Sequence, residues 1–280
     1  MGALIAAAAV WAGGWGLNAI LARRALRGPA RLLPPLVFGV TLLVIWELVV
    51  RGLNVSPVLL PAPSAIGARI ASSTAVLWTD LRQTFFKGAL TGYAIGCGAA
   101  FLTGILADRV PFLRRGLLPV GNFVAALPII GMAPIMVMWF GFDWQSKAAV
   151  VVLMCFFPML INTVQGLAAA EPMQADLMRT YAASSWQSLL YLKLPAAAPF
   201  LFNGLKICTT LALIGAIVAE FFGSPTSGMG FRISTEVGRL ALDMVWAEIA
   251  VAAVVGSAFY GAVALFERAT TFWHPSQRGE

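Results

Sequence analysis

Charged side chains are scarce in this sequence. Asp, Glu, Lys and Arg together make up 11% of the 280 residues, whereas a soluble domain carries about 25%. Hydrophobic residues make up 60%. A chain of this composition cannot cover itself with a water-soluble surface, so we predict that it lies in a lipid bilayer.

Residues that commonly carry catalysis or hold metals are also few. The single histidine is His274, and Cys97, Cys155 and Cys208 lie in three separate apolar runs. Their spacing assembles no metal cluster, disulfide framework or nucleophile–base pair, and the sequence has no G-x-x-x-x-G-K-[ST] phosphate loop. We therefore expect no catalytic residue, no metal and no bound cofactor. If ATP drives the protein, a separate subunit must bind the ATP and its magnesium.

Apolar runs account for most of the chain. A helix needs about 20 apolar residues to cross roughly 30 Å of hydrocarbon. Runs of that length lie at 3–21, 33–50, 85–107, 117–140, 147–169, 200–223 and 246–266. This pattern predicts an all-α polytopic membrane protein. Glycines and prolines interrupt each run, which packed membrane helices tolerate.

Arginines are concentrated in two short segments between these runs, 23–31 and 109–115. The positive-inside rule places such segments in the cytoplasm, with the amino terminus outside and the carboxyl terminus inside. The net charge of +7 is distributed beside the spans rather than gathered in one aromatic-rich patch. We therefore expect membrane lipid, and no nucleic acid, around the protein.

No charged residue lies at the centre of a predicted span. Lys206 and Glu220 share one run but are roughly 21 Å apart along a helix, so they cannot pair. We expect Lys206 to reach the inner headgroups and regard Glu220, near the outer end, as a candidate gating residue. Ion-coupled carriers usually hold a titratable group at mid-span. Its absence disfavours a self-contained carrier or channel, which stays as the alternative class.

Three local features are predicted along the chain. Positive charges follow the 3–21 run instead of preceding it, so we expect a retained span and not a signal peptide; Gly13, Gly14 and Gly16 either allow a close helix contact there or belong to a lipid-facing anchor. Gly88, Gly92 and Gly96 let another helix approach the third span. The 53–83 segment predicts an interfacial helix on the outer face, capped by Ser64 and beginning at Ala65.

A polar, helix-forming segment at 176–195, DLMRTYAASSWQSLLYLKLP, separates two of the apolar runs. A water-facing helical segment in a lipid-soluble protein is suited to contact a soluble partner. Ser184 is the expected N-cap of the turn that leads to Trp186. Asp176 precedes Arg179 by three residues, and two roles stay open for it: stabilising the start of its helix, or contacting the partner.

The spacing of this segment resembles the cytoplasmic EAA loop of bacterial ABC importer permeases: EAA, three residues, G, nine residues, I, one residue, LP. Alignment on Leu194 and Pro195 places Asp176 at the acidic position, Ala182 at the glycine and Leu192 at the isoleucine. Arg179 and Thr180 follow the position of the alanine pair. Leu177 and Met178 replace the two alanines, and Ala182 replaces the glycine. Because alanine disfavours positive φ, we expect a more continuously helical turn than glycine would form.

Further segments extend the likeness over most of residues 33–273. They are WELVVR (46–51), LPAPS (60–64), ALPIIGMAPIMVMWFGF (126–142) and PAAAPFLFNGLKICTTLALIGAIVAEFFGS (195–224). They are similar to the nitrate, sulfonate and taurine branch of these permeases. Within that branch, the last segment most resembles permeases for hydroxymethylpyrimidine, a thiamine precursor.

The resemblance implies a six-helix type I permease core in 27–280, with residues 1–26 as an extra transmembrane segment. It implies that loop 171–199 docks on an ATPase through Asp176, Arg179, Thr180, Ala182, Ala183, Ser184, Ser185, Leu194 and Pro195. Two ATPase copies, a second permease copy forming a homodimer, and a periplasmic substrate-binding protein are the implied partners, all at the bacterial inner membrane. The implied solute is hydroxymethylpyrimidine-like, with taurine, aliphatic sulfonates, nitrate and riboflavin-like solutes open; no substrate residue is predicted.

Overall fold

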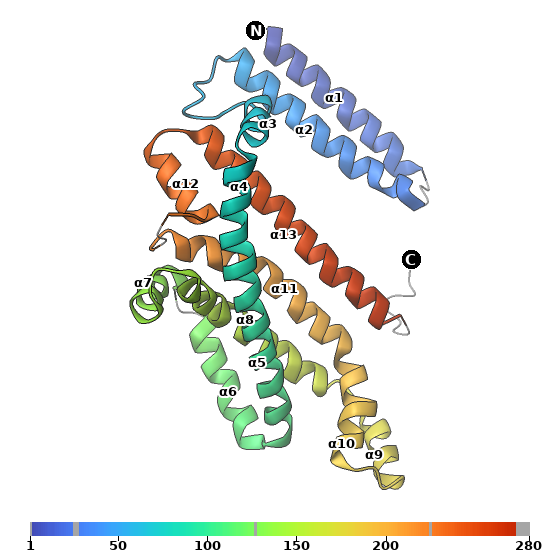
Figure 1. The fold of residues 1–280 in the computed structure, drawn as a ribbon. Coiled ribbons are helices and arrows are strands. Elements are labelled where there is room, and N and C mark those ends of the chain that lie inside the picture. The colour runs from blue at the N-terminus through green and yellow to red at the C-terminus, as the bar shows by residue number, and fades with distance from the viewer. Residues whose placement is uncertain (1, 25–27, 126–127, 224–225, 273–280) are drawn as a thin grey trace. The chain divides into compact units, whose positions relative to one another are not determined.

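The computed structural model describes residues 2–24, 28–125, 128–223 and 226–272 (Figure 1). The described residues form helices and contain no strand, which confirms the all-α prediction. His274 and residues 224–225 lie outside the described part. The chain divides into two compact units, Met1–Leu77 with Ile233–Ala250, and Trp78–Arg232 with Val251–Glu280.

The first unit contains α1 (Gly2–Arg23), the 3₁₀ helix η1 (Gly28–Leu32), α2 (Leu33–Gly52) and α3 (Pro63–Ser72). α1 and α2 lie side by side (Figure 1). Gly14 permits this contact, because a Cβ there would come within 2.5 Å of Thr41 Cγ2, whereas Gly13 and Gly16 face open space. The prediction of a close helix contact is therefore confirmed at Gly14 alone.

The predicted cap of α3 is wrong. α3 begins at Pro63, and its N-cap is Ala62, which makes no side-chain cap bond. Proline is pre-organised for the first helical turn, so it sets the start earlier than Ser64 would. Ser64 instead donates its backbone N–H and its hydroxyl to the Glu47 carboxylate on α2, at 3.0 and 2.7 Å.

The second half of the predicted interfacial segment belongs to a long helix. α4 (Thr74–Leu81) continues through a π-helical turn, η2 (Arg82–Ala89), into α5 (Leu90–Arg109). A comparable run joins α10 (Ser185–Ser188), the π-helical η3 (Leu189–Lys193) and α11 (Leu194–Glu220). Extra residues are commonly inserted into helices in this way at functional positions.

Among the described helices, six are long and apolar enough to cross a membrane: α1, Ala30–Gly52, Thr74–Arg109, α8 (Trp144–Leu167), Ser185–Glu220 and α13 (Leu242–Thr270). The run predicted at 117–140 is divided instead between α6 (Pro111–Ala125) and α7 (Ile129–Phe140). Pro128 is the N-cap of α7 and lacks the N–H that a continuous helix needs. Residues 126 and 127 lie outside the described part. α12 (Met229–Gly238) precedes α13.

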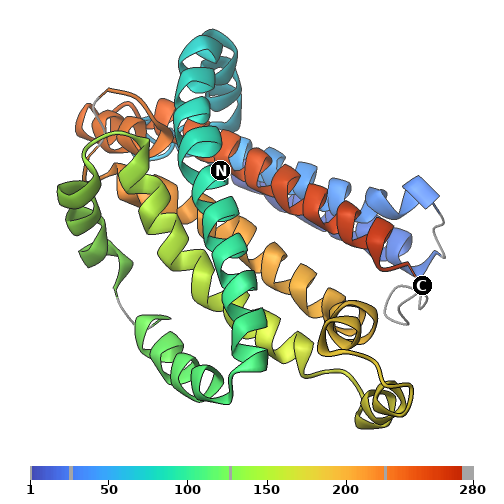
Figure 2. The ribbon, with the colours of Figure 1, turned by 60° about the horizontal axis from the view of Figure 1, so that its bottom comes forward.

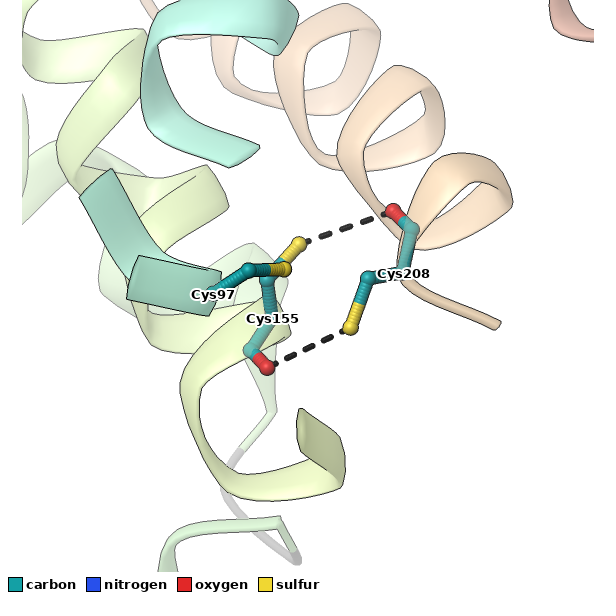
Figure 3. Close-up of side chains that lie close together, drawn as sticks. All are labelled: Cys97, Cys155 and Cys208. Atoms are coloured by element: carbon teal, nitrogen blue, oxygen red, sulfur yellow. Dashed lines mark hydrogen bonds between the residues drawn. The ribbon is translucent and has the colours of Figure 1, made fainter. Parts of the chain in front are cut away.

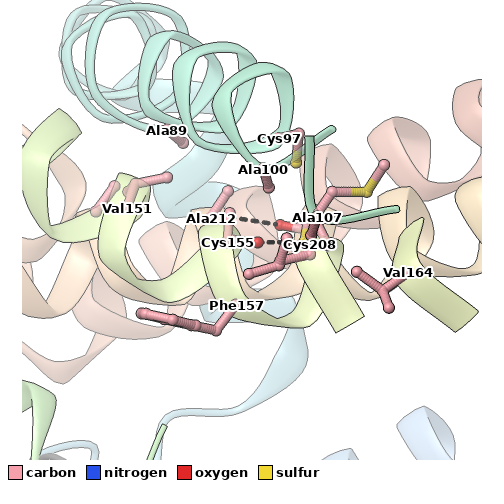
Figure 4. Close-up of a cluster of buried hydrophobic side chains, with 13 residues drawn as sticks. Ala89, Cys97, Ala100, Ala107, Val151, Cys155, Phe157, Val164, Cys208 and Ala212 are labelled. Carbon is pink, nitrogen blue, oxygen red and sulfur yellow. Dashed lines mark hydrogen bonds between the residues drawn. The ribbon is translucent and has the colours of Figure 1, made fainter. Parts of the chain in front are cut away.

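α5, α8 and α11 form the centre of the second unit, where α8 packs along both of the others (Figure 2). Glycines allow the α5–α8 contact: a Cβ on Gly92 would lie 2.5 Å from Val151 Cβ, and one on Gly96 would lie 3.0 Å from Val152 Cα. Small buried side chains such as Ala100 and Ala212 fill the space between the helices (Figure 4). The prediction that this glycine series permits close helix approach is confirmed.

Candidate functional site

Two short helices form the loop 171–199. α9 (Pro172–Thr180) and α10 lie beyond one end of α11 (Figure 1). α9 ends where Ala182 N–H donates to the Arg179 carbonyl at 2.9 Å and Ala183 N–H donates to the Met178 carbonyl at 3.0 Å. This bonding pattern is a Schellman motif, which requires a left-handed residue after the helix, and Ala182 has φ +52°. The expected continuous helix at Ala182 is therefore wrong, because these bonds satisfy the last carbonyls of α9.

Ser184 is the N-cap of α10, as predicted. Its hydroxyl accepts from Gln187 N–H at 3.3 Å, and its own N–H donates to Gln187 Oε1 at 2.7 Å. This reciprocal capping box satisfies two helix-end donors. Ala182, Ser184 and Ser185 are exposed and Ala183 is half-buried, so small side chains line the tip between the two helices.

Asp176 and Arg179 form an exposed ion pair, 3.0 Å between Arg179 Nη1 and Asp176 Oδ1. Exposed pairs of this kind contribute about 0–1 kcal/mol. Asp176 lies past the first turn of α9, which holds no acidic residue, so the suggested role at the start of the helix is wrong. Thr180 donates its hydroxyl to the Asp176 carbonyl at 3.0 Å.

An exposed apolar stripe follows α9. Met173, Leu177 and Tyr181 recur every four residues, which places them on one helical face, and 81%, 55% and 77% of their respective surfaces are exposed. We call these three residues the apolar stripe. Exposed apolar side chains in an otherwise polar segment mark contact surfaces. The sequence analysis missed the stripe, although its four-residue spacing is visible in the sequence.

The base of the loop is fixed to the end of α5. Lys193 in η3 donates to the Asp108 carboxylate at 2.7 Å, and the Arg109 guanidinium lies 4.2 Å from the centre of the Trp186 ring. Leu194 and Pro195 are half-buried at the start of α11. These contacts hold the carboxyl-terminal part of the loop against the end of α5.

Glu220 lies at the other end of α11, almost completely buried. Its carboxylate accepts from the Thr84 hydroxyl at 2.9 Å and from Gly230 N–H at 2.8 Å. Beside it, the buried Asp80 carboxylate accepts from Gly228 N–H at 2.7 Å and from Arg232 Nε at 2.8 Å. We call Asp80, Thr84 and Glu220 the polar anchor, because they hold the turn before α12.

Glycines are required in this turn. Gly228 has φ +128°, and a Cβ on Gly230 would collide with the Ile217 carbonyl oxygen. The π-helical turn η2 contains Thr84, so this local irregularity lies where Thr84 meets Glu220. Asp80 and Thr84 were missed by the sequence analysis because nothing in their spacing links them to Glu220.

Two lysines have defined partners in the second unit. Lys147 is buried at the start of α8, where its Nζ donates to the carbonyls of Phe142 and Gly223. Lys206, which we expect to reach the inner headgroups, donates its Nζ to Glu267 Oε2 on α13 at 2.7 Å. A buried ammonium group requires such partners.

The three cysteines converge, contrary to the expectation from their spacing. Cys97, Cys155 and Cys208 come from α5, α8 and α11, and their Sγ atoms all lie within 4.8 Å of one another (Figure 3). Cys155 and Cys208 donate their thiols to each other's backbone carbonyls at 3.6 and 3.3 Å. Three thiols could ligate a soft metal ion, but the buried cluster around them is apolar and offers no charge to balance thiolates. Their evident role is close packing of three helices.

Comparison with known proteins identifies the architecture. Residues 92–272 match the family of binding-protein-dependent transport system inner membrane components. The chain belongs to this family. It is the permease subunit of an ABC importer, a multi-pass inner-membrane protein and a transport component, not an enzyme. Membership removes the alternative of a self-contained carrier.

Individual relatives of the permease carry different names. The formylaminopyrimidine transport permease ThiX of Halalkalibacterium halodurans is 32% identical, over 88% of this chain and 97% of that protein. The riboflavin transport permease RibX of Chloroflexus aurantiacus is 30% identical over 84% and 88%. The putative aliphatic sulfonates permease SsuC of Bacillus subtilis is 30% identical over 87% and 88%.

A solved structure shares the fold. An inward-facing structure of the MetNI methionine ABC transporter superposes with a TM-score of 0.55 at 20% identity, covering 71% of this chain and 95% of that one. At this identity the likeness shows the type I importer fold.

Proposed function

We propose that this permease imports a neutral, hydroxymethylpyrimidine-like thiamine precursor. Support comes from the thiamine-type likeness of residues 195–224 and from the formylaminopyrimidine permease among the relatives. Relatives named for riboflavin, aliphatic sulfonates and taurine have 28–30% identity, so these solutes and nitrate stay as alternatives. A periplasmic binding protein delivers the solute, and recognition begins there.

Loop 171–199 is the ATPase-docking element in this proposal. The observation that carries it is the apolar stripe beside a tip of small residues, on a base fixed to α5. The tip has small side chains that allow it to enter a groove on the ATPase subunit closely: Ala182, Ala183, Ser184 and Ser185. The exposed Asp176–Arg179 pair offers charges to the same partner, while Thr180, Leu194 and Pro195 shape the loop and its exit into α11.

The proposed assembly is a homodimer of this permease with two ATPase subunits, which bind ATP and magnesium. The loop lies in the cytoplasm with the carboxyl terminus, and the amino terminus lies outside. Residues 1–26 are an extra transmembrane segment beside the 27–280 permease domain. Glu220 then lies at the outer end of α11, and we assign the polar anchor to holding the outer gate.

A substitution at the tip tests the docking assignment. Ala183→Glu places a bulky charge between the two loop helices, and we expect the ATPase to be lost from the purified complex while the permease stays in the membrane. Ala169→Glu, at an exposed site just before the loop, is the matched control and should retain the ATPase. Normal import by the Ala183→Glu complex is the result that overturns the assignment.

The solute is tested separately. The periplasmic binding protein encoded beside this gene should be titrated calorimetrically with hydroxymethylpyrimidine, taurine, nitrate and riboflavin. We expect tight binding of the pyrimidine. Tight binding of taurine or nitrate with no pyrimidine response rejects the thiamine-precursor proposal and leaves the permease assignment unchanged.

A further inference from the structure

A groove of about 480 Å³ runs between α11 and the 251–270 part of α13. Small-molecule sites commonly have volumes of this order. The groove is lined by Thr210, Leu213, Ile214, Ile217, Ala252, Ala253, Gly256, Ser257 and Tyr260. The lining contains three hydroxyl groups and no charged side chain.

These three hydroxyls differ from the others in the surrounding helices. Within the described residues, Thr210, Ser257 and Tyr260 make no side-chain hydrogen bond. Every other Ser, Thr or Tyr side chain in α5, α8, α11 and the 251–270 part of α13 donates to a backbone carbonyl: Thr91, Tyr93, Thr103, Ser146, Thr163, Thr209 and Thr270. The unsatisfied hydroxyls are therefore gathered in one groove.

A hydroxyl group that faces hydrocarbon without a hydrogen-bond partner is energetically unfavourable. Membrane helices usually avoid that cost by bonding the hydroxyl to the carbonyl one turn earlier, as Thr103 and Thr163 do here. Thr210 and Ser257 leave that bond unmade. The groove is thus suited to water or a polar solute and poorly suited to lipid chains.

The chemistry of the lining defines the solute. Hydroxyls both donate and accept, so they match ring nitrogens and exocyclic amino or hydroxyl groups. The partly exposed Tyr260 ring offers an aromatic face for stacking, and apolar side chains cover the rest. A sulfonate or nitrate would lack the charged donors that such anions prefer.

We propose that the α11–α13 groove is a solute contact site on the translocation path, and that it takes a neutral heteroaromatic ring through Thr210, Ser257 and Tyr260. This inference rests on the proposed import of a pyrimidine. It assigns the membrane domain its own share of selectivity, in addition to that of the binding protein.

Cysteine accessibility tests whether the groove holds water. Ser257→Cys in the reconstituted complex is treated with a charged methanethiosulfonate, which reacts only with thiols that meet water. Val254→Cys is the matched control, because Val254 lies on the same helix, is 69% exposed and is not part of the groove lining. The three native cysteines are buried and give little background. We expect rapid modification of Ser257→Cys, and slow modification of Val254→Cys.

Hydroxymethylpyrimidine, supplied with the binding protein and ATP, should slow the modification of Ser257→Cys. An unreactive Ser257→Cys overturns the inference, since the groove would then face lipid or a second copy of the chain. Equal reaction of Val254→Cys, or modification that the pyrimidine leaves unchanged in a complex that imports it, also overturns it.

Removing the hydroxyls tests the contacts themselves. Tyr260→Phe and Ser257→Ala should each lower pyrimidine uptake about fivefold, the effect of one lost neutral hydrogen bond. Thr103→Val, which removes a hydroxyl outside the groove, should leave uptake unchanged. Uptake unaffected by both groove variants contradicts the inference. A wild-type complex that imports a sulfonate and no pyrimidine instead contradicts the proposed function.

Discussion

Ala182 holds a left-handed backbone conformation, so its replacement by glycine should stabilise the turn between α9 and α10. Its φ is +52°, where a residue with a Cβ is disfavoured by about 1–2 kcal/mol. Glycine's greater freedom in the unfolded chain offsets about 0.5–1 kcal/mol of that gain. We expect Ala182→Gly to stabilise the turn by about 0.5–1 kcal/mol, or roughly two- to fivefold in its opening equilibrium.

Amide hydrogen exchange measures this effect locally. The Ala183 amide donates to the Met178 carbonyl across the turn, so its protection, corrected for the changed neighbour, should rise two- to fivefold. Ala183→Gly is the opposing control. Ala183 does not have positive φ, so glycine there should lower the protection of the Tyr181 and Ala182 amides by a similar factor. Unchanged protection in Ala182→Gly, or a change of the same sign in both variants, would refute the reasoning.

Three further substitutions have matched controls. Gly92→Ala should destabilise the permease, lowering its melting temperature in detergent, because its Cβ would lie 2.6 Å from the Ala148 carbonyl oxygen; Gly98→Ala faces open space and should not, so equal melting of the two contradicts the packing. Ser184→Ala should reduce the stability of α10 by about 1 kcal/mol through loss of the cap, seen as faster exchange of the Gln187 amide, whereas Ser185→Ala should leave that exchange unchanged. Glu220→Ala should lower the stability of the protein by about 1–3 kcal/mol for each buried donor left without a partner, and Glu220→Gln by less because it can still accept the Gly230 N–H; a Glu220→Ala protein that melts like wild type would remove the polar anchor as a stabilising feature.

The spans were predictable because their signal is local. Hydrophobic runs of sufficient length identify membrane helices whatever their neighbours are, and the cap at Ser184 follows from residues within one turn. The positions at which an apolar run divides into two helices were harder to predict from the sequence. The sequence shows prolines within the 117–140 run, yet proline is compatible with either a kinked helix or two helices, and the sequence does not distinguish them.

Contacts between distant segments could not be derived. Asp80, Thr84 and Glu220 meet only because α4, η2 and α11 pack together, and the cysteines converge for the same reason. The left-handed Ala182 was mispredicted because a propensity argument was applied to a position where two backbone hydrogen bonds outweigh it. At that position the local hydrogen bonds at the end of α9 decide the backbone conformation.

The helical run Ser185–Glu220 leads without interruption from loop 171–199 to the polar anchor. At 1.5 Å per residue it is a rod of about 50 Å, and the segment from Asp80 to Arg109 lies antiparallel to it. The two rods are fastened at both ends, by Lys193–Asp108 and Arg109–Trp186 at one end and by Thr84–Glu220 at the other. Such a frame resists shear: a tilt of ~10° imposed at the loop displaces the far end by about 9 Å as one body. If the proposed ATPase docks at loop 171–199, a force that it applies there would reach the Gly228–Gly230 turn through the two rods themselves, with no need for a relay of side-chain rearrangements.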